Sequence, residues 1–135
     1  MKNLEVSAGI LINNDQILCL QRGRGKYDYV SYKYEFPGGK LEEGESPAAA
    51  LQRELVEEMH LNIKEAGCRY FMTVEHQYPD FHLIMHAFIC NLDSRDFDLV
   101  EHIDYRWLNT EKLDELDWAG ADWPIVHRLM EERDT

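Results

Sequence analysis

The sequence predicts one α/β or α+β domain, a layered sandwich of strands and helices. Its 135 residues are enough for one compact core and too few for two comfortable domains. Strand-like apolar runs are interspersed with segments of helical character, and no repeat, low-complexity tract or linker rich in Pro, Gly and Ser divides them. We therefore expect residues 1–135 to form a single domain.

The first two elements are predicted to form a β-hairpin. Residues 4–12 (LEVSAGILI) have the apolar content of a largely buried strand, and residues 17–21 (ILCLQ) resume an extended apolar pattern. Residues 13–16 (NNDQ) are typical of a turn, so the two strands are expected to pair.

A polar and aromatic segment follows the hairpin. Residues 22–33 (RGRGKYDYVSYK) contain Gly23 and Gly25 and have no firm periodicity, which indicates a surface loop. A short strand is predicted at 34–36 (YEF), before the residues PGG and a charged loop. Loops as long as 22–33 are often functional.

A helix is predicted over residues 47–59. Ser46 is a suitable N-cap and Pro47 suits the first helical position. The three alanines that follow are strong helix formers.

Two more strands, residues 68–76 and 81–90, are predicted to form a second hairpin, since Pro79 and Asp80 between them favour a turn. An acidic loop at 93–104 follows.

The C-terminal part is predicted to begin with a short strand at 105–109. Thr110 is expected to cap a short helix at 111–116, and residues 122–133 have the pattern of a final amphipathic helix.

The composition limits the partners of this protein. The formal net charge of −12 argues against nucleic-acid polymers and anionic membranes, because their phosphates would be repelled. A small anionic substrate would need divalent cations and a few placed Arg or Lys side chains.

No signal segment is recognised, so a soluble, cytoplasmic protein is expected. Cys19, Cys68 and Cys90 are an odd number without any close pairing that would suggest a zinc or redox site, and we expect buried reduced thiols.

Carboxylates cluster on the predicted helix. Glu54, Glu57 and Glu58 share one face, and an effective dielectric of about 20 gives a repulsion of roughly 3 kcal/mol for each pair. Arg53 and Lys40 can offset part of this repulsion. Mg²⁺ matches clustered carboxylate oxygens and bridges them to phosphates, although such a face on an arbitrary helix is usually only solvated.

The surrounding pattern resembles the Nudix box, G-x5-E-x7-R-E-U-x-E-E-x-G-U, in which U is apolar. The matching residues are Gly39, Glu45, Arg53, Glu54, Leu55, Glu57, Glu58 and Leu61. His60 stands where the motif has its second Gly, a position that usually adopts the left-handed conformation. We expect a local energetic cost or an altered turn there, and retained metal binding.

The segments YEFPGGK and ADWPIV extend the resemblance to the MutT-like Nudix hydrolases and to the bacterial CTP pyrophosphohydrolases among them. The resemblance implies an α/β/α sandwich with a mixed β-sheet. It also implies hydrolysis of nucleoside triphosphates to a monophosphate and pyrophosphate with Mg²⁺ or Mn²⁺.

The resemblance also assigns roles to single residues. Glu54 is expected to be the general base, and it, Glu57, Glu58, Glu101 and the carbonyl of Gly39 are expected to contact the metal. Glu101 lies six residues before Trp107, where the MutT pattern supplies a fourth carboxylate.

Two further residues are expected to support this cluster. Arg53 is expected to orient the carboxylates by ion pairing, and Glu45 to support the loop and the start of the helix.

Four residues are candidates for substrate binding. Arg22 and Lys40 are expected to contact phosphate, with an ordinary surface cation as the alternative for each. Tyr78 can either stack on the base or pack the hairpin turn. Asp122 stands in the place of a base-reading Asn, and an ionised Asp would accept from the amine of cytosine.

The expected substrate is therefore a nucleoside triphosphate, CTP or dCTP, or an oxidised nucleotide such as 8-oxo-dGTP. The alternatives are a Nudix hydrolase of ADP-ribose or of dinucleoside polyphosphates, and a non-catalytic nucleotide-binding module.

Overall fold

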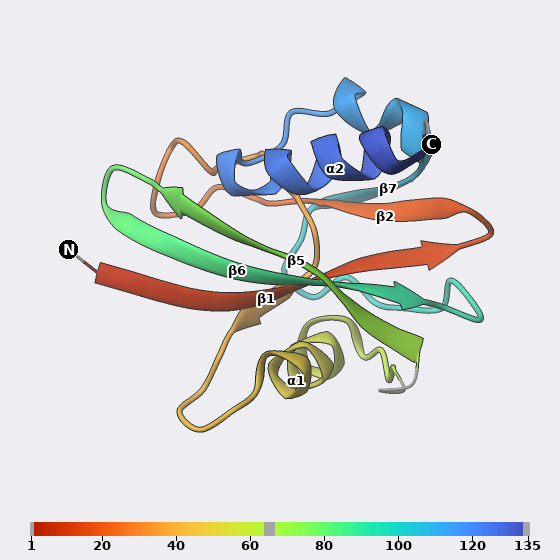
Figure 1. Ribbon diagram of the computed structural model, residues 1–135, viewed down its shortest axis with the longest axis horizontal. Helices are drawn as coiled ribbons and strands as arrows, with labels where there is room; N and C mark the ends of the chain where they lie inside the picture. The colour runs from red at the N-terminus through yellow and green to blue at the C-terminus, as the bar shows by residue number, and fades with distance from the viewer. Residues whose placement is uncertain (1, 64–66, 134–135) are drawn as a thin grey trace.

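The computed structural model describes residues 2–63 and 67–133, and within them a mixed β-sheet lies between two helices (Figure 1). The strands are β1 (Lys2–Asn13), β2 (Gln16–Gln21), β3 (Tyr34–Glu35), β4 (Gly38–Lys40), β5 (Cys68–Gln77), β6 (Phe81–Asn91) and β7 (Asp104–Asn109). The helices are α1 (Pro47–Met59) and α2 (Trp123–Arg133). They cover opposite sides of the sheet, which confirms the predicted sandwich.

The sheet is mixed because β1 pairs in parallel with β6 along nearly its whole length. The other pairings are antiparallel, and the strand order is β3-β2-β1-β6-β5, with β4 on β1 and β7 on β2. A parallel pair needs a long crossover. Here the chain between β1 and β6 includes helix α1 and the β5 edge strand.

Both predicted hairpins are confirmed. β1 and β2 meet at a turn in which Asn14 and Asp15 have φ values of 51° and 63°. Positive φ at both central residues is the requirement of the tightest hairpin turns, and Asn and Asp tolerate it. β5 and β6 pair from Gln77↔His82 to Cys68↔Cys90, with one shift of register between Tyr70 and Met72.

Two local predictions were wrong. Gly38–Lys40 is a strand and not a loop, because its backbone lies so close to β1 that a Cβ on Gly38 would be 1.9 Å from the Ser7 carbonyl oxygen. Thr110 is the first residue of a 3-10 turn, Thr110–Glu115, and the preceding Asn109 makes no side-chain cap. The predicted final helix is confirmed as α2, and a separate 3-10 turn, Gly120–Asp122, precedes it.

All three cysteines are free thiols, as expected; Cys19 and Cys90 are buried and Cys68 is half-buried. The sequence spacing did not indicate the following pairing. Cys68 on β5 lies directly opposite Cys90 on β6. The cause is an irregularity in the register between Tyr70 and Met72, which shifts the pairing by one residue and which the sequence does not announce.

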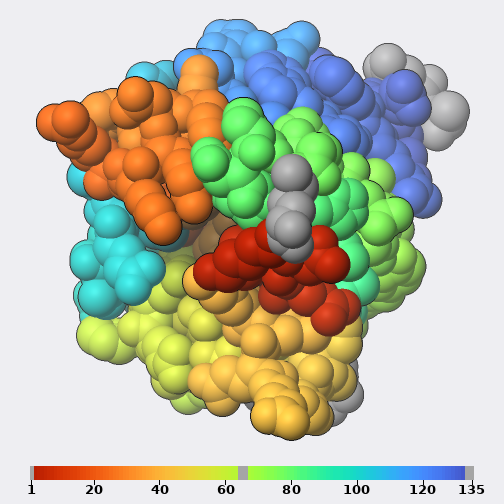
Figure 2. Space-filling model, turned by 90° about the vertical axis from the view of Figure 1, so that its left-hand side faces the viewer, coloured from red at the N-terminus to blue at the C-terminus, as the bar shows by residue number. Residues whose placement is uncertain are grey.

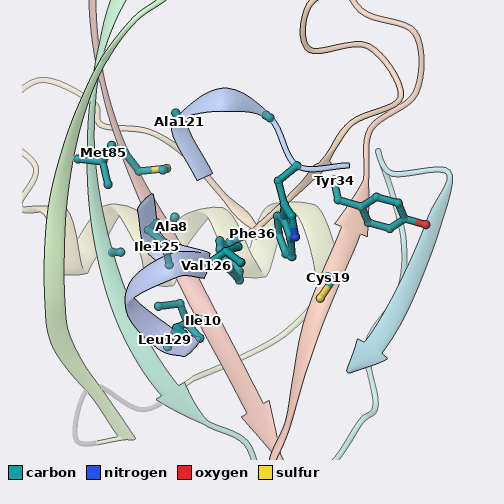
Figure 3. Packing of buried hydrophobic residues seen from close by; sticks show 14 of the residues in the cluster. Ala8, Ile10, Cys19, Tyr34, Phe36, Met85, Ala121, Ile125, Val126 and Leu129 are labelled. Atoms are coloured by element: carbon teal, nitrogen blue, oxygen red, sulfur yellow. The ribbon is translucent and has the colours of Figure 1, made fainter. Parts of the chain in front are cut away.

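Two apolar clusters form the core. The larger one packs beneath α2 and includes Ala8, Ile10, Ile125 and Val126 (Figure 3). The smaller one packs beneath α1, where its buried members are Leu11, Leu18, Leu20, Leu51, Leu55, Met59, Leu61 and Cys90. Alternation along β1 places Ile10 and Leu11 in different clusters, so both faces of the sheet are covered.

The loops meet at one end of the sheet. Figure 2 shows the N-terminal strand (red) between the 22–33 loop (orange) and the loop before α1 (gold), with the 93–104 segment (cyan) beside them. In the described ranges 2–63 and 67–133, no helix is long and apolar enough to cross a membrane.

Candidate active site

Helix α1 presents the carboxylate face because its other face is anchored in the core. The Ser46 hydroxyl accepts a hydrogen bond from the backbone N–H of Ala49, and Pro47 occupies the first turn, as expected. The inward side chains of Leu51, Leu55 and others are fully buried. The glutamates three and four positions apart therefore face outward together.

Arg53 organises this face. Its Nε and Nη2 donate to the two oxygens of Glu45 at 2.7 and 2.9 Å, which is a bidentate pair. Its Nη1 donates to Glu54 at 2.9 Å and to Glu57 at 3.1 Å, and Nη2 also donates to the Lys40 carbonyl at 2.8 Å. These contacts hold the pKa of Glu45 down at about 2, mainly through the hydrogen bond from Arg53. One guanidinium thus hydrogen-bonds to the backbone of β4 and to three carboxylates.

Glu58 is a largely buried carboxylate on the same helix. Its Oε2 is buried and has no hydrogen-bond partner among the described residues. Burial, together with the charges of Glu101 and Glu54, raises the pKa of Glu58 to about 9. A hydrogen bond also links Glu58 to Glu101. The structure therefore brings the late-loop carboxylate to the helix.

Gly39 lies directly against Glu54. A Cβ on Gly39 would lie 2.3 Å from Cδ of Glu54, far inside van der Waals contact. Only glycine lets the β4 backbone approach this carboxylate so closely. Gly39, Glu54, Glu58 and Glu101 therefore form one neighbourhood.

These residues fit a divalent cation. Among residues 2–63 and 67–133, no group of three His, Cys, Asp or Glu side chains is already arranged to hold a metal ion. The unpaired oxygen of Glu58 and the crowded charges of Glu54 and Glu101 are nonetheless what a hard cation would satisfy, because it supplies the missing partner and offsets the repulsion.

The loop that carries Glu101 is tied to the end of α1. The backbone N–H of Asp98 donates to the carbonyl of Met59 at 3.0 Å. His60 Nδ1 and Asp98 Oδ2 are 2.8 Å apart. His60 has φ 51° and ψ 35°, so it keeps the left-handed conformation of the motif glycine at a local cost, as one of the two expectations stated. The sequence did not indicate the contact between the His60 and Asp98 side chains.

Glu35 is a site residue that sequence reasoning missed. One of its oxygens is 3.4 Å from Nη1 of Arg22 and the other is 2.8 Å from Nε2 of His102. Its charge also raises the pKa values of Glu58 and Asp122. Glu35 thus lies between the carboxylate cluster and the candidate base-binding residues, and it holds the candidate phosphate contact Arg22.

Asp122 is buried, with 5% of its surface exposed, and its Oδ1 accepts from the backbone N–H of Phe36 at 3.1 Å. Burial raises its pKa well above the usual range, and the charge of Glu35 adds to this effect. The raised pKa favours the protonated form of Asp122 over the ionised form expected from the sequence. A protonated Asp122 can both donate and accept hydrogen bonds.

Tyr78 packs the hairpin turn, which was one of its two expected roles. Its ring is stacked with that of Tyr29, with centroids 5.3 Å apart, and its hydroxyl accepts from the Ala121 N–H at 2.9 Å. Only 6% of Tyr78 is exposed.

Lys40 is exposed and does not join the carboxylate cluster through its side chain. It lines a shallow depression with Asn3, Glu5 and the acidic loop before α1. Only its backbone carbonyl reaches Arg53.

The NUDIX domain family matches residues 3–129. The 8-oxo-dGTP diphosphatase of Escherichia coli (strain K12) is 29% identical over 129 residues, covering 96% of this chain and 98% of that protein. The enzyme of the same name from Haemophilus influenzae is 31% identical over 97% of this chain and 94% of its own length. The CTP pyrophosphohydrolase of Escherichia coli is 30% identical over 96% and 93% of the two chains.

Solved structures agree with these relatives. The solution structure of the E. coli ORF135 protein superposes with a TM-score of 0.82 at 29% identity, covering 98% of this chain and 92% of that one. The MutT protein from Methanosarcina mazei Go1 superposes with a TM-score of 0.84 at 21% identity, over 99% and 97% of the chains, which shows the shared fold.

Proposed function

Because this chain belongs to the Nudix hydrolase family, we propose that it hydrolyses nucleoside triphosphates to a nucleoside monophosphate and pyrophosphate. The observation that carries the proposal is the neighbourhood of Gly39, Glu54, Glu58 and Glu101, in which a buried carboxylate oxygen lacks a partner. CTP or dCTP and oxidised nucleotides such as 8-oxo-dGTP are the proposed substrates, supported by relatives named for both activities.

The carboxylates Glu54, Glu57, Glu58 and Glu101, with the Gly39 carbonyl, would hold a divalent cation, Mg²⁺ or Mn²⁺. When bound, such a cation neutralises phosphate charge and lowers the pKa of a coordinated water.

The remaining chemistry falls to side chains of this chain. Glu54 accepts the proton of the attacking water at its carboxylate. Arg53 keeps Glu54 in place through the 2.9 Å hydrogen bond. Arg22 is the proposed phosphate contact, which is supported by its ion pair with Glu35 and by its 40% exposed side chain.

Base recognition is proposed to involve Asp122 and the backbone around Phe36. A neutral carboxylic acid offers one donor and one acceptor. It can accept from the amine of cytosine or donate to a purine carbonyl, so a raised pKa at Asp122 is compatible with both proposed substrate groups.

The test is pyrophosphate release from ordinary and oxidised nucleoside triphosphates, with ADP-ribose and a dinucleoside polyphosphate included, in Mg²⁺ and in chelator. Glu54→Gln should lower kcat by about 10²–10⁴ while folding normally. Release of pyrophosphate that depends on metal and on Glu54 supports the proposal. Faster turnover of ADP-ribose or of the dinucleoside polyphosphate than of every triphosphate would overturn the substrate, and no turnover would favour a binding module.

A further inference from the structure

Cys68 and Cys90 form a cluster that the proposed reaction does not use. They lie directly opposite each other on the antiparallel strands β5 and β6. Directly opposite residues in such a pair have Cα atoms about 4.5 or 5.5 Å apart, and both values fall within the range that a disulfide spans. The geometry therefore needs no large backbone movement for a bond between the two sulfurs.

The register that creates this pairing is specific. From Gln77↔His82 to Met72↔Ala87 the strands pair in one register, and from Tyr70↔Phe88 onward the pairing is displaced by one residue. Without this bulge, Cys68 would face Asn91 and the two thiols would not be opposite each other. The bulge also directs Cys68 toward the α1 side of the sheet, where Cys90 lies.

The two thiols already interact. A hydrogen bond between them is the largest influence on both groups, and it lowers the pKa of Cys68 and raises that of Cys90. Cys68 is half-buried and can be reached from solvent, whereas Cys90 is 1% exposed. The pair therefore has one accessible member and one protected member. Cys19, in the other core cluster, is 0% exposed and faces neither of them.

We propose that Cys68 and Cys90 are a reversible dithiol site that closes to an intramolecular disulfide when it meets a low-molecular-weight disulfide such as oxidised glutathione. The Cys68 thiolate attacks one sulfur of glutathione disulfide and releases one glutathione thiolate, which leaves a mixed disulfide on Cys68. Cys90 then loses its proton to solvent, and its thiolate attacks the Cys68 sulfur and releases the second glutathione. Two protein thiols are oxidised and one glutathione disulfide is reduced to two thiols.

The accessible and protected positions suit these two steps. Attack by an external disulfide requires access only at Cys68, and resolution is internal. Once Cys68 carries glutathione, it is no longer a thiolate that accepts the hydrogen bond of the Cys90 thiol, which is the contact that raises the pKa of Cys90. Cys90 is packed with Leu55 and Met59 beneath α1, so the bond would join the edge strand to the layer that supports the carboxylate face.

The test is mass spectrometry of the full chain after incubation with oxidised glutathione, followed by denaturing alkylation. The wild-type protein should lose two hydrogen atoms, retain one alkylatable thiol, Cys19, and regain all three after reduction. Cys90→Ala should trap glutathione on Cys68, and Cys68→Ser should remain unmodified. Cys19→Ala is the matched control and should close the bond as the wild type does, with no thiol left to alkylate.

The disulfide should also raise the melting temperature of the wild type by several degrees, since it closes a loop in the unfolded chain, and this gain should be absent in Cys68→Ser. A wild-type protein that stays reduced, one that keeps glutathione on Cys68 while Cys90 remains alkylatable, or a disulfide-linked dimer would overturn the proposal. None of these readouts depends on nucleotide hydrolysis.

Discussion

Glu58 is expected to lower the stability of the fold and to be required for catalysis. Its pKa in the folded chain, about 9, lies above the ordinary value of about 4.3. The folded state therefore binds the proton more tightly than the unfolded state, and the free energy of unfolding falls as pH rises through this window.

Glu58→Gln should raise the melting temperature by several degrees at pH 7 in chelator, because the wild-type carboxyl must take up a proton on folding at this pH, whereas Gln is neutral in both states. The gain should vanish below about pH 4, where the wild-type carboxyl is protonated in both states. The same variant should lose about 10²-fold or more of its Mg²⁺-dependent activity. Thermal scans and pyrophosphate release measure the two effects.

The control for this variant is Glu57→Gln, which makes the same change on the same helix at a side chain that is 58% exposed. It should leave the melting temperature in chelator nearly unchanged. A lower melting temperature for Glu58→Gln in chelator would show that burial of the Glu58 carboxyl does not destabilise the fold.

Asp122→Asn tests whether the buried Asp122 side chain is protonated in the folded protein. The raised pKa of Asp122 means that wild-type stability also falls as pH rises above the ordinary range of Asp, about 3.9. Asn keeps an acceptor for the Phe36 N–H and cannot ionise. The stability advantage of the variant, measured by urea unfolding, should therefore grow from pH 5 to pH 9. An advantage that is independent of pH would show that Asp122 does not titrate in this range.

Among single residues, the sequence predicted those that belong to a motif of fixed spacing, such as Glu54 and Gly39. It missed Glu35 and His102, since a single acidic residue on a short strand carries no periodic signal and their 2.8 Å contact joins segments 67 residues apart. The paired cysteines were missed for a related reason, because a bulge sets their register.

At the scale of elements, the end of helix α1 determines how the Glu101 loop is held. His60 is in a left-handed conformation that costs a non-glycine residue about 1–2 kcal/mol, and its exposed pair with Asp98 returns about 0–1 kcal/mol. His60 therefore destabilises the end of the helix through its backbone, while its side chain tethers the Glu101 loop through Asp98.

His60→Gly should leave the free energy of unfolding unchanged or raise it by up to about 1 kcal/mol. It should also increase the Mg²⁺ concentration needed for half-maximal activity by about two- to fivefold, since the loop loses one tether. Denaturant titration measures the expected gain in stability, and metal titration of activity measures the expected weaker response to Mg²⁺.

Asp98→Ala is the companion variant, because it removes the tether and leaves the left-handed residue in place. It should raise the Mg²⁺ requirement without the gain in stability. An unchanged metal requirement in both variants would mean that the backbone bond from Asp98 to Met59 suffices to hold the loop.

Most elements were predictable because their signals are local. Ser46 and Pro47 define the start of α1, and the turn residues Asn14 and Asp15 define the first hairpin. The β4 strand was not predictable, since Gly38 and Gly39 have low strand propensity and are placed by the close approach of β1.

At the scale of the whole molecule, the net charge of −12 opposes the approach of an anionic nucleotide. Long-range repulsion is screened over about 8 Å at 0.15 M ionic strength. Added monovalent salt at constant free Mg²⁺ should therefore raise kcat/KM by about two- to threefold up to this ionic strength. Initial rates at low substrate concentration measure the effect, with thermal scans to verify that the fold is unchanged. A steady decrease would show that local attraction by Arg22 outweighs the field of the whole protein.

The long parallel pairing of β1 with β6 also has a consequence for synthesis. The N-terminal strand leaves the ribosome first, yet its partner begins about 80 residues later, at Phe81. At about 5–20 residues per second, the apolar residues of β1 wait for several seconds before that partner exists. The nascent chain therefore depends on the antiparallel β2 hairpin, or on a chaperone, to shield its first strand until the centre of the sheet can close.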